Sequence, residues 1–108
     1  MNKASFYIRQ KKDDNTVYSQ VNGYTFRWNL HDYGVWHKAR GQWIIVDIKS
    51  GMSVIQIKNL KDLDNHLTTE LANKLNAAYK KPFYKQACDA LWFDRFQNTW
   101  SNYDETNG

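Results

Sequence analysis

The sequence contains few residues that form disulfides or interrupt regular secondary structure: one cysteine, one proline and five glycines. The single Cys88 cannot form an intramolecular disulfide, which excludes a disulfide-stapled secreted framework, and we expect it to be a small buried hydrophobe. There is no long apolar run and no apolar N-terminal segment, which excludes a membrane span and a cleaved signal peptide. These absences predict a cytoplasmic protein that has no contact with a membrane.

The 108 residues are 42 % hydrophobic and 16 % aromatic, enough for one modest core and too few for two. We expect a single domain over residues 1–96 and a loose polar tail over 97–108, where no periodicity is visible. The net charge of +4 is uneven, because basic residues gather in 1–58 and the C-terminal part is mildly acidic. Such a balance attracts a phosphate backbone or an acidic protein surface.

The organising stretch is Trp43–Ile57, where two apolar runs rich in β-branched residues flank Lys49-Ser50-Gly51. This pattern predicts a β-hairpin. The first run, from Trp43 to Ile48, is apolar almost without alternation, as in a strand covered on both faces. The return run alternates, as in a half-exposed neighbour.

More strands are predicted before this hairpin. Ser5–Arg9 is a strand, Gln10–Asn15 an exposed loop and Thr16–Val21 a second strand, and Asn22-Gly23 carries the strongest short hairpin signal. Tyr24, Phe26, Trp28 and Leu30 then alternate with polar residues, giving one aromatic face. His31–Gly34 is expected to turn, and Val35–Ala39 is either a brief strand or an irregular loop.

From Leu60 the apolar period changes to three and four residues, which predicts an amphipathic helix with Asn59 as N-cap. Pro82 ends it and begins a second helix that runs to about Phe96. The sequence therefore predicts an α+β fold: an antiparallel four- to five-stranded meander sheet followed by two C-terminal helices packed on one face.

The sequence contains two patterns with the residue types of a catalytic or metal-binding site. Asp47-Ile48-Lys49 resembles the D-x-K half of the PD-(D/E)xK nucleases, whose other metal-binding aspartate would have to be Asp32. The simpler interpretation is that Asp47 and Lys49 flank a turn and face solvent. His31, Asp32 and His37 could suggest a metal, but no second Cys or His cluster completes a set of four ligands. We expect no enzyme activity, no metal and no cofactor.

A basic–aromatic segment gives the predicted partner-binding residues: Arg27, Tyr33, Trp36, Lys38 and Arg40. Aromatic side chains and arginine anchor protein interfaces, and the same residue types stack on bases and follow phosphates in single strands. Both kinds of ligand stay open here. An alternative acidic contact surface would consist of Asp89, Asp94, Asp104 and Glu105.

The segment Val21–Leu67 resembles a pattern of small phage and mobile-element proteins of low-GC Gram-positive bacteria. In those proteins a hairpin of the form W-x-V-x-D-x-x-[ST]-G precedes a helix. Here the corresponding positions are Trp43, Ile45, Asp47, Ser50 and Gly51, preceded by Asn22-Gly23-Tyr24-Thr25-Phe26 and followed by Asn59-Leu60-Lys61.

Several such proteins inhibit host defence, including anti-CRISPR proteins. The resemblance implies a non-enzymatic binder made by a mobile element and acting in the bacterial host cell. Its oligomeric state stays open between a monomer and a homodimer. The binder would occupy a nucleic-acid-binding or functional surface of a large host protein, such as a CRISPR nuclease. The alternative is a small nucleic-acid-binding accessory protein, with a metal-dependent nuclease as the third possibility.

Overall fold

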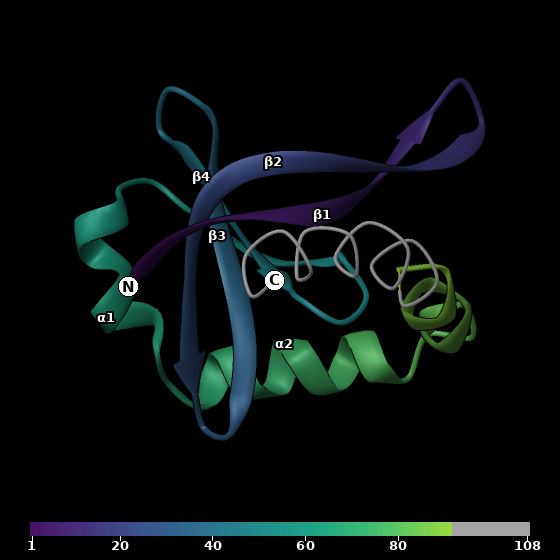
Figure 1. Cartoon of the computed structure of the whole chain (residues 1–108). Coiled ribbons are helices and arrows are strands. Elements are labelled where there is room, and N and C mark those ends of the chain that lie inside the picture. Colours follow the sequence, from purple (N-terminus) through teal and green to yellow (C-terminus); the bar gives the residue numbers. More distant parts are fainter. Residues whose placement is uncertain (92–108) are drawn as a thin grey trace, which may run out of the picture.

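The computed structural model describes residues 1–91 and shows a five-stranded antiparallel sheet in the order β1-β2-β3-β4-β5, followed by short helices (Figure 1). The predicted α+β class and meander order are confirmed. The strands are β1 Asn2–Lys12, β2 Asn15–Trp28, β3 His31–Ala39, β4 Gln42–Asp47 and β5 Ser53–Ile57. The helices are η1 Leu60–Asp62, α1 Leu63–His66 and α2 Thr69–Tyr79, and residues 84–91 are also helical.

The predicted tail over 97–108 lies outside the described residues, as does the end of the second predicted helix. Within residues 1–91, no helix is both long and apolar enough to cross a membrane.

The first hairpin turn lies within the predicted Gln10–Asn15 loop, whereas the second is not where the sequence signals predicted it. Asp13-Asp14 and Asn29-Leu30 form two-residue turns with positive φ at all four residues. Asn22-Gly23 was wrongly predicted as a turn: both residues lie inside β2, paired with Ser5 and Ala4. The predicted Gln10–Asn15 loop is therefore mostly strand, and the residues predicted to turn at His31–Gly34 begin β3.

Gly23 is needed because two strands approach closely at this point. A Cβ atom on residue 23 would lie 2.3 Å from the carbonyl oxygen of Val35 on β3. Strand β2 pairs with β1 from Asn15 to Thr25, but with β3 only from Tyr24 to Trp28. Beyond Gly23 it bends away from β3 and continues with β1 as a long hairpin (Figure 1).

The sheet curls so that β1 reaches the far end of the meander. The backbone N–H of Arg9 donates to the carbonyl oxygen of Gly51, in the turn between β4 and β5, over 2.8 Å. Inside the curl a cluster of buried side chains forms, with Val21, Trp36 and Ile48 packed against it: Phe6, Ile8, Ile44 and Val46. This curl leaves the opposite, outer face of the sheet for the helices.

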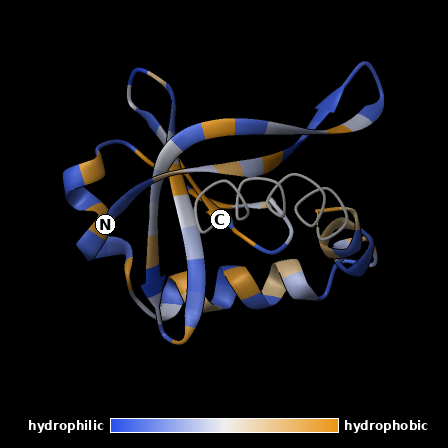
Figure 2. Cartoon of the chain, in the orientation of Figure 1, coloured by the Kyte–Doolittle hydropathy of each residue, from blue (hydrophilic) through white to orange (hydrophobic). Residues whose placement is uncertain are grey.

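The larger core lies between that outer face and the helices. Buried Tyr33, Val35, Ile45 and Ile57 pack against Leu63, Leu71 and Leu75. The predicted aromatic face is confirmed at Tyr24, Phe26 and Trp28, which pack against this cluster, whereas Leu30 is in a turn and is 87 % exposed. Figure 2 shows the apolar residues of the strands and of α2, and the polar tip of the β1–β2 hairpin.

The single helix predicted from Leu60 is broken. It is divided at Leu67-Thr68, where the side chain of Thr68 caps α2 by accepting a hydrogen bond from the N–H of Glu70 over 3.2 Å. Asn59 precedes η1 but makes no side-chain cap. The helix at 84–91 packs through Ala87 against Met52 and Ala78, with Tyr18 and Phe83 beside them.

Candidate binding site

The bend of β2 creates a fork in the sheet. Tyr24 and Val35 are the last paired residues of β2 and β3, and beyond them the β1–β2 hairpin and the β3–β4 hairpin diverge toward opposite sides of Figure 1. A groove of about 500 Å³ opens at the base of this fork. It is lined by residues of four strands, and we call it the fork groove: Lys3, Ala4, Ser5, Asn22, Gly23, Tyr24, His37 and Trp43.

Register explains why these residues meet. Lys3 pairs with Tyr24, Ser5 with Asn22, and His37 with Trp43, and residues paired across antiparallel strands project from the same face of a sheet. All six therefore lie on the outer face. The helices cover the part of this face at Tyr33, Val35 and Ile45, while the fork groove remains open beside them.

The fork groove combines ring faces with hydrogen-bond donors. The rings of His37 and Trp43 stack with centroids 4.6 Å apart and planes 19° apart, with His37 exposed and Trp43 half-buried. Ser5 donates to the Oδ1 atom of Asn22 over 2.6 Å, which leaves the amide N–H₂ group of Asn22 for other partners. Lys3 adds an exposed ammonium group, and none of the described lining residues is acidic.

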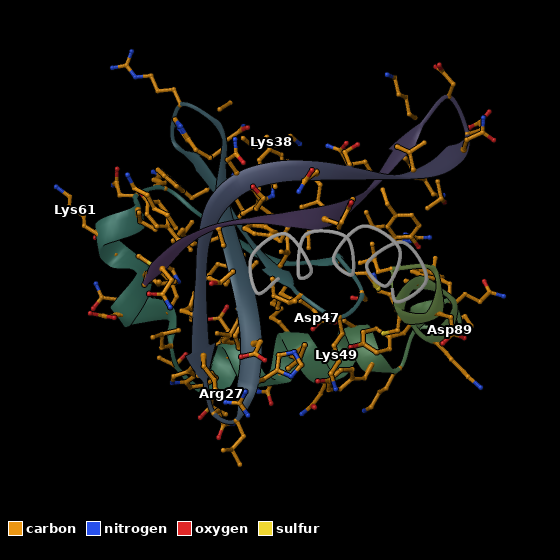
Figure 3. The ribbon with its side chains drawn as sticks, in the orientation of Figure 1. Arg27, Lys38, Asp47, Lys49, Lys61 and Asp89 are labelled. Atoms are coloured by element: carbon orange, nitrogen blue, oxygen red, sulfur yellow. The ribbon has the colours of Figure 1, made fainter. Side chains whose placement is uncertain are left out.

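The five predicted partner-binding residues do not form one surface. Arg27 pairs with Asp32 over 3.2 Å at the β2–β3 turn, at the opposite end of the sheet from Lys38 (Figure 3). Tyr33 is only 1 % exposed, so its prediction as a surface contact is wrong. Lys38 and Arg40 are exposed at the β3–β4 hairpin, which also carries the groove residues His37 and Trp43.

Trp36 lies on the inner face of the sheet and is half-buried against the cluster around Ile44. Its indole N–H is buried and has no hydrogen-bond partner among the described residues. Of the predicted acidic surface, Asp89 is exposed on the helix at 84–91, while Asp94, Asp104 and Glu105 lie outside the described residues.

Sequence reasoning missed Lys3, Ser5, Asn22 and Trp43 as site residues. Lys3 and Ser5 are far in sequence from the basic–aromatic segment, Asn22 was assigned to a turn, and Trp43 was assigned to the core. The signal that could have found them is strand register, because β1 brings Lys3 opposite Tyr24 only when β2 continues through Asn22-Gly23.

A second polar constellation is buried beneath the helices and centres on Asp47. This residue has no exposed surface, so the prediction that it faces solvent is wrong. Its Oδ1 atom lies 2.6 Å from His31 Nε2, while Oδ2 accepts from Ser50 Oγ over 2.7 Å and from the Tyr84 hydroxyl over 2.6 Å. Three segments of the chain thus meet at one carboxyl group: the start of β3, the turn between β4 and β5, and the helix at 84–91.

The network extends through His31 toward the surface. The Nδ1 atom of His31 lies 3.0 Å from the hydroxyl of Tyr79, which is 41 % exposed. Burial and the hydrogen bond to Asp47 raise the pKa of Tyr84. Burial, together with the nearby Tyr79 and Asp47, raises the pKa of Tyr33 to about 12. The raised pKa values hold both phenols in their neutral form, and that of Tyr84 donates to Asp47.

The two patterns weighed for metal chemistry are dispersed. Asp47 shares the outer face with Tyr33, its cross-strand partner, so Asp32, the next residue along β3 from Tyr33, projects from the opposite face. Lys49 is exposed. His37 stacks on Trp43, whereas His31 contacts Asp47. Among residues 1–91, no three His, Cys, Asp or Glu side chains gather as a metal site.

Comparison of the chain with protein-family models, with curated proteins and with solved structures gave no match.

Proposed function

We propose that this chain is a non-enzymatic binding protein that holds a segment of a larger protein in the fork groove. One observation carries the proposal: register brings Lys3, Tyr24, His37 and Trp43, from four different strands, around one open groove whose described lining has no acidic residue. Lys38 and Arg40 extend the positive charge along the neighbouring hairpin.

The residue types suit a protein partner. Interfaces are anchored by a few aromatic and cationic side chains, while opposite charge speeds encounter and fixes orientation. The fork groove offers two stacked rings and an ammonium group. A complementary partner segment is therefore acidic, with apolar side chains that cover the rings.

The His31–Asp47 pair supports a structural rather than a catalytic assignment. His31 Nε2 lies 2.6 Å from Asp47 Oδ1, and His31 Nδ1 lies 3.0 Å from the Tyr79 hydroxyl. Both ring nitrogens of His31 are thus in contact with groups of the protein itself. We therefore assign the network to holding the helices on the sheet.

The identity of the larger protein rests on the sequence resemblance. Inhibition of a host defence nuclease, in the manner of anti-CRISPR proteins, is the proposal that follows from it. Binding of a nucleic-acid strand in the same groove is the competing outcome, because stacked rings and cations also hold single strands.

The test is affinity capture from a Gram-positive lysate treated with nuclease, using the wild-type protein, Lys3→Glu and the matched variant Lys74→Glu. Lys74 is exposed on α2 and does not line the groove. We expect one large protein to be captured by the wild type and by Lys74→Glu, and at least tenfold less of it by Lys3→Glu.

Two results would overturn the proposal. Equal capture by Lys3→Glu and Lys74→Glu would place the contact elsewhere. Loss of every partner after nuclease treatment, with direct oligonucleotide binding that weakens steeply as salt rises, would make nucleic acid the ligand.

A further inference from the structure

Among residues 1–91, the fork leaves part of the β2 edge without a neighbouring strand, and the two-residue turns show which backbone groups lie along it. In an antiparallel ladder the residues of one strand direct their N–H and C=O groups alternately to one neighbour and to the other. The Asp13-Asp14 turn closes on the hydrogen-bonded pair of Lys12 and Asn15, so even-numbered residues of β1 face β2 and odd-numbered residues face away. The bond from Arg9 N–H to Gly51 agrees with this assignment.

The same argument applied to β2 identifies the free groups. The Asn29-Leu30 turn closes on Trp28 and His31, so Trp28, Phe26 and Tyr24 face β3. Continued pairing would join Asn22 to His37, but the strands have diverged there. The outward N–H and C=O groups of Gln20 and Asn22 therefore have no backbone partner among residues 1–91.

This edge is also unprotected, in contrast to the other long edge of the sheet. Natural proteins guard exposed edges with charged side chains, proline or bulges, because a bare edge pairs with other strands. The free part of β2, Thr16–Gly23, has no charged residue and no proline. The outer edge of β1 carries Lys3, Arg9 and Lys11, and β5 is only five residues long.

We propose that the partner segment binds as an extended strand added to the free edge of β2 at Gln20 and Asn22, with acidic side chains directed toward Lys3 and His37. This inference rests on the proposed function and gives its mode of binding. Strand addition draws affinity from backbone hydrogen bonds and specificity from alternate side chains. The free edge of β2 supplies the backbone hydrogen bonds, and the fork groove beside it receives every second side chain of the partner segment.

The test uses a seven-residue peptide of alternating Val and Glu, added to the full chain labelled with ¹⁵N. We expect amide shifts centred on Gln20, Asn22 and His37. Two further peptides are N-methylated on alternate residues, one at the odd positions and one at the even positions. One of them is expected to bind at least tenfold more weakly than the parent peptide, and the other about equally, because only one set of N–H groups faces β2.

Four results would overturn strand addition: no shifts at these residues, equal loss for both methylated peptides, equal binding of a Val-Lys peptide, or displacement of the peptide by an oligonucleotide. Shifts that grow with protein concentration in the absence of peptide would make a second copy of this chain the occupant. If capture from lysate depends on Lys3 but methylation at either set of positions has the same effect, the proposed function stands and only the strand mode fails.

Discussion

The ring of Phe6 on β1 lies directly against Gly34 on β3, so closely that a Cβ atom on residue 34 would be 2.7 Å from two ring carbons. The two residues are joined by no direct strand pairing, since Gly34 pairs with Thr25 and Val46. Their contact exists because the sheet curls, and it fills the inner cluster.

Gly34→Ala is therefore expected to destabilise the fold. The added methyl group must displace the Phe6 ring within a packed cluster, at a cost of about 1–3 kcal/mol. Urea unfolding followed by circular dichroism measures this change. In the double variant with Phe6→Leu, we expect the effects of the two changes to be less than additive, because the smaller side chain vacates the contested space. Strict additivity would show that the contact is not tight.

Asp47→Ala is expected to lower the free energy of unfolding by about 3–5 kcal/mol, since it leaves buried polar groups without their acceptor. The matched control is Asp32→Ala. That carboxylate is paired with Arg27, and both side chains are more than half exposed, so its removal is expected to cost less than about 1 kcal/mol. Similar losses for the two variants in chemical denaturation would argue against the Asp47 network as the attachment point of the helices.

Leu30→Gly is expected to stabilise the protein by about 1 kcal/mol. Leu30 has a φ of 62° and is 87 % exposed, so it adopts a left-handed conformation with little packing in return. Glycine adopts this conformation without strain, and Asn-Gly is the preferred pair for such a turn. An increase in the thermal midpoint is the measurement. A decrease would mean that the Leu30 side chain is held by contacts in solution.

Alkaline pH is expected to destabilise the fold through its buried tyrosines. The folded pKa of Tyr33 is about 12 against an ordinary value of 10.0, and that of Tyr84 is also raised. A group with a raised folded pKa loses its proton first in the unfolded chain, so stability is retained below pH 10 and falls as pH rises above it.

Each such tyrosine adds a slope of about 1.4 kcal/mol per pH unit in this range. Denaturant titrations at pH 9, 10 and 11 would show the slope, and Tyr33→Phe or Tyr84→Phe is expected to flatten it. An unchanged slope in both variants would contradict the assignment.

The sequence predicted the parts of the fold that depend on local pattern. The Trp43–Ile57 hairpin, the aromatic face at Tyr24, Phe26 and Trp28, and the change to helical periodicity after Leu60 are all confirmed. In each case the periodicity of apolar residues reports directly which face is buried.

Tertiary contacts overrode local signals elsewhere. Asn22-Gly23 has the residues of a tight turn, but the glycine is used for close approach to Val35, while the less suitable Asn29-Leu30 forms the turn. The Asp47 network was also beyond sequence reasoning, because a single aspartate at the end of a strand carries no sign that histidine and tyrosine from distant segments will surround it.

The candidate site was predicted only in part, for a geometric reason. Lys38, Arg40 and His37 belong to the basic–aromatic segment and lie on the β3–β4 hairpin beside the fork groove, but Arg27 is at the other end of the sheet. Arg27 pairs with Asp32 at the start of β3, whereas Lys38 lies near the end of that strand. Predicting a site that crosses four strands requires the register of strand pairing, which the amino-acid composition does not give.

The Asp47 network also bears on the order in which parts of the chain fold during synthesis. Tyr84 follows Asp47 by 37 residues, so the carboxyl group leaves the ribosome well before the hydroxyl that will cover it. Strand pairing in the meander needs only neighbouring segments and can begin on the emerging chain, with Asp47 still hydrated. Docking of the helix at 84–91 then dehydrates the carboxyl group. A ribosome stalled before residue 84 is exposed would therefore hold a paired sheet whose C-terminal covering is still missing.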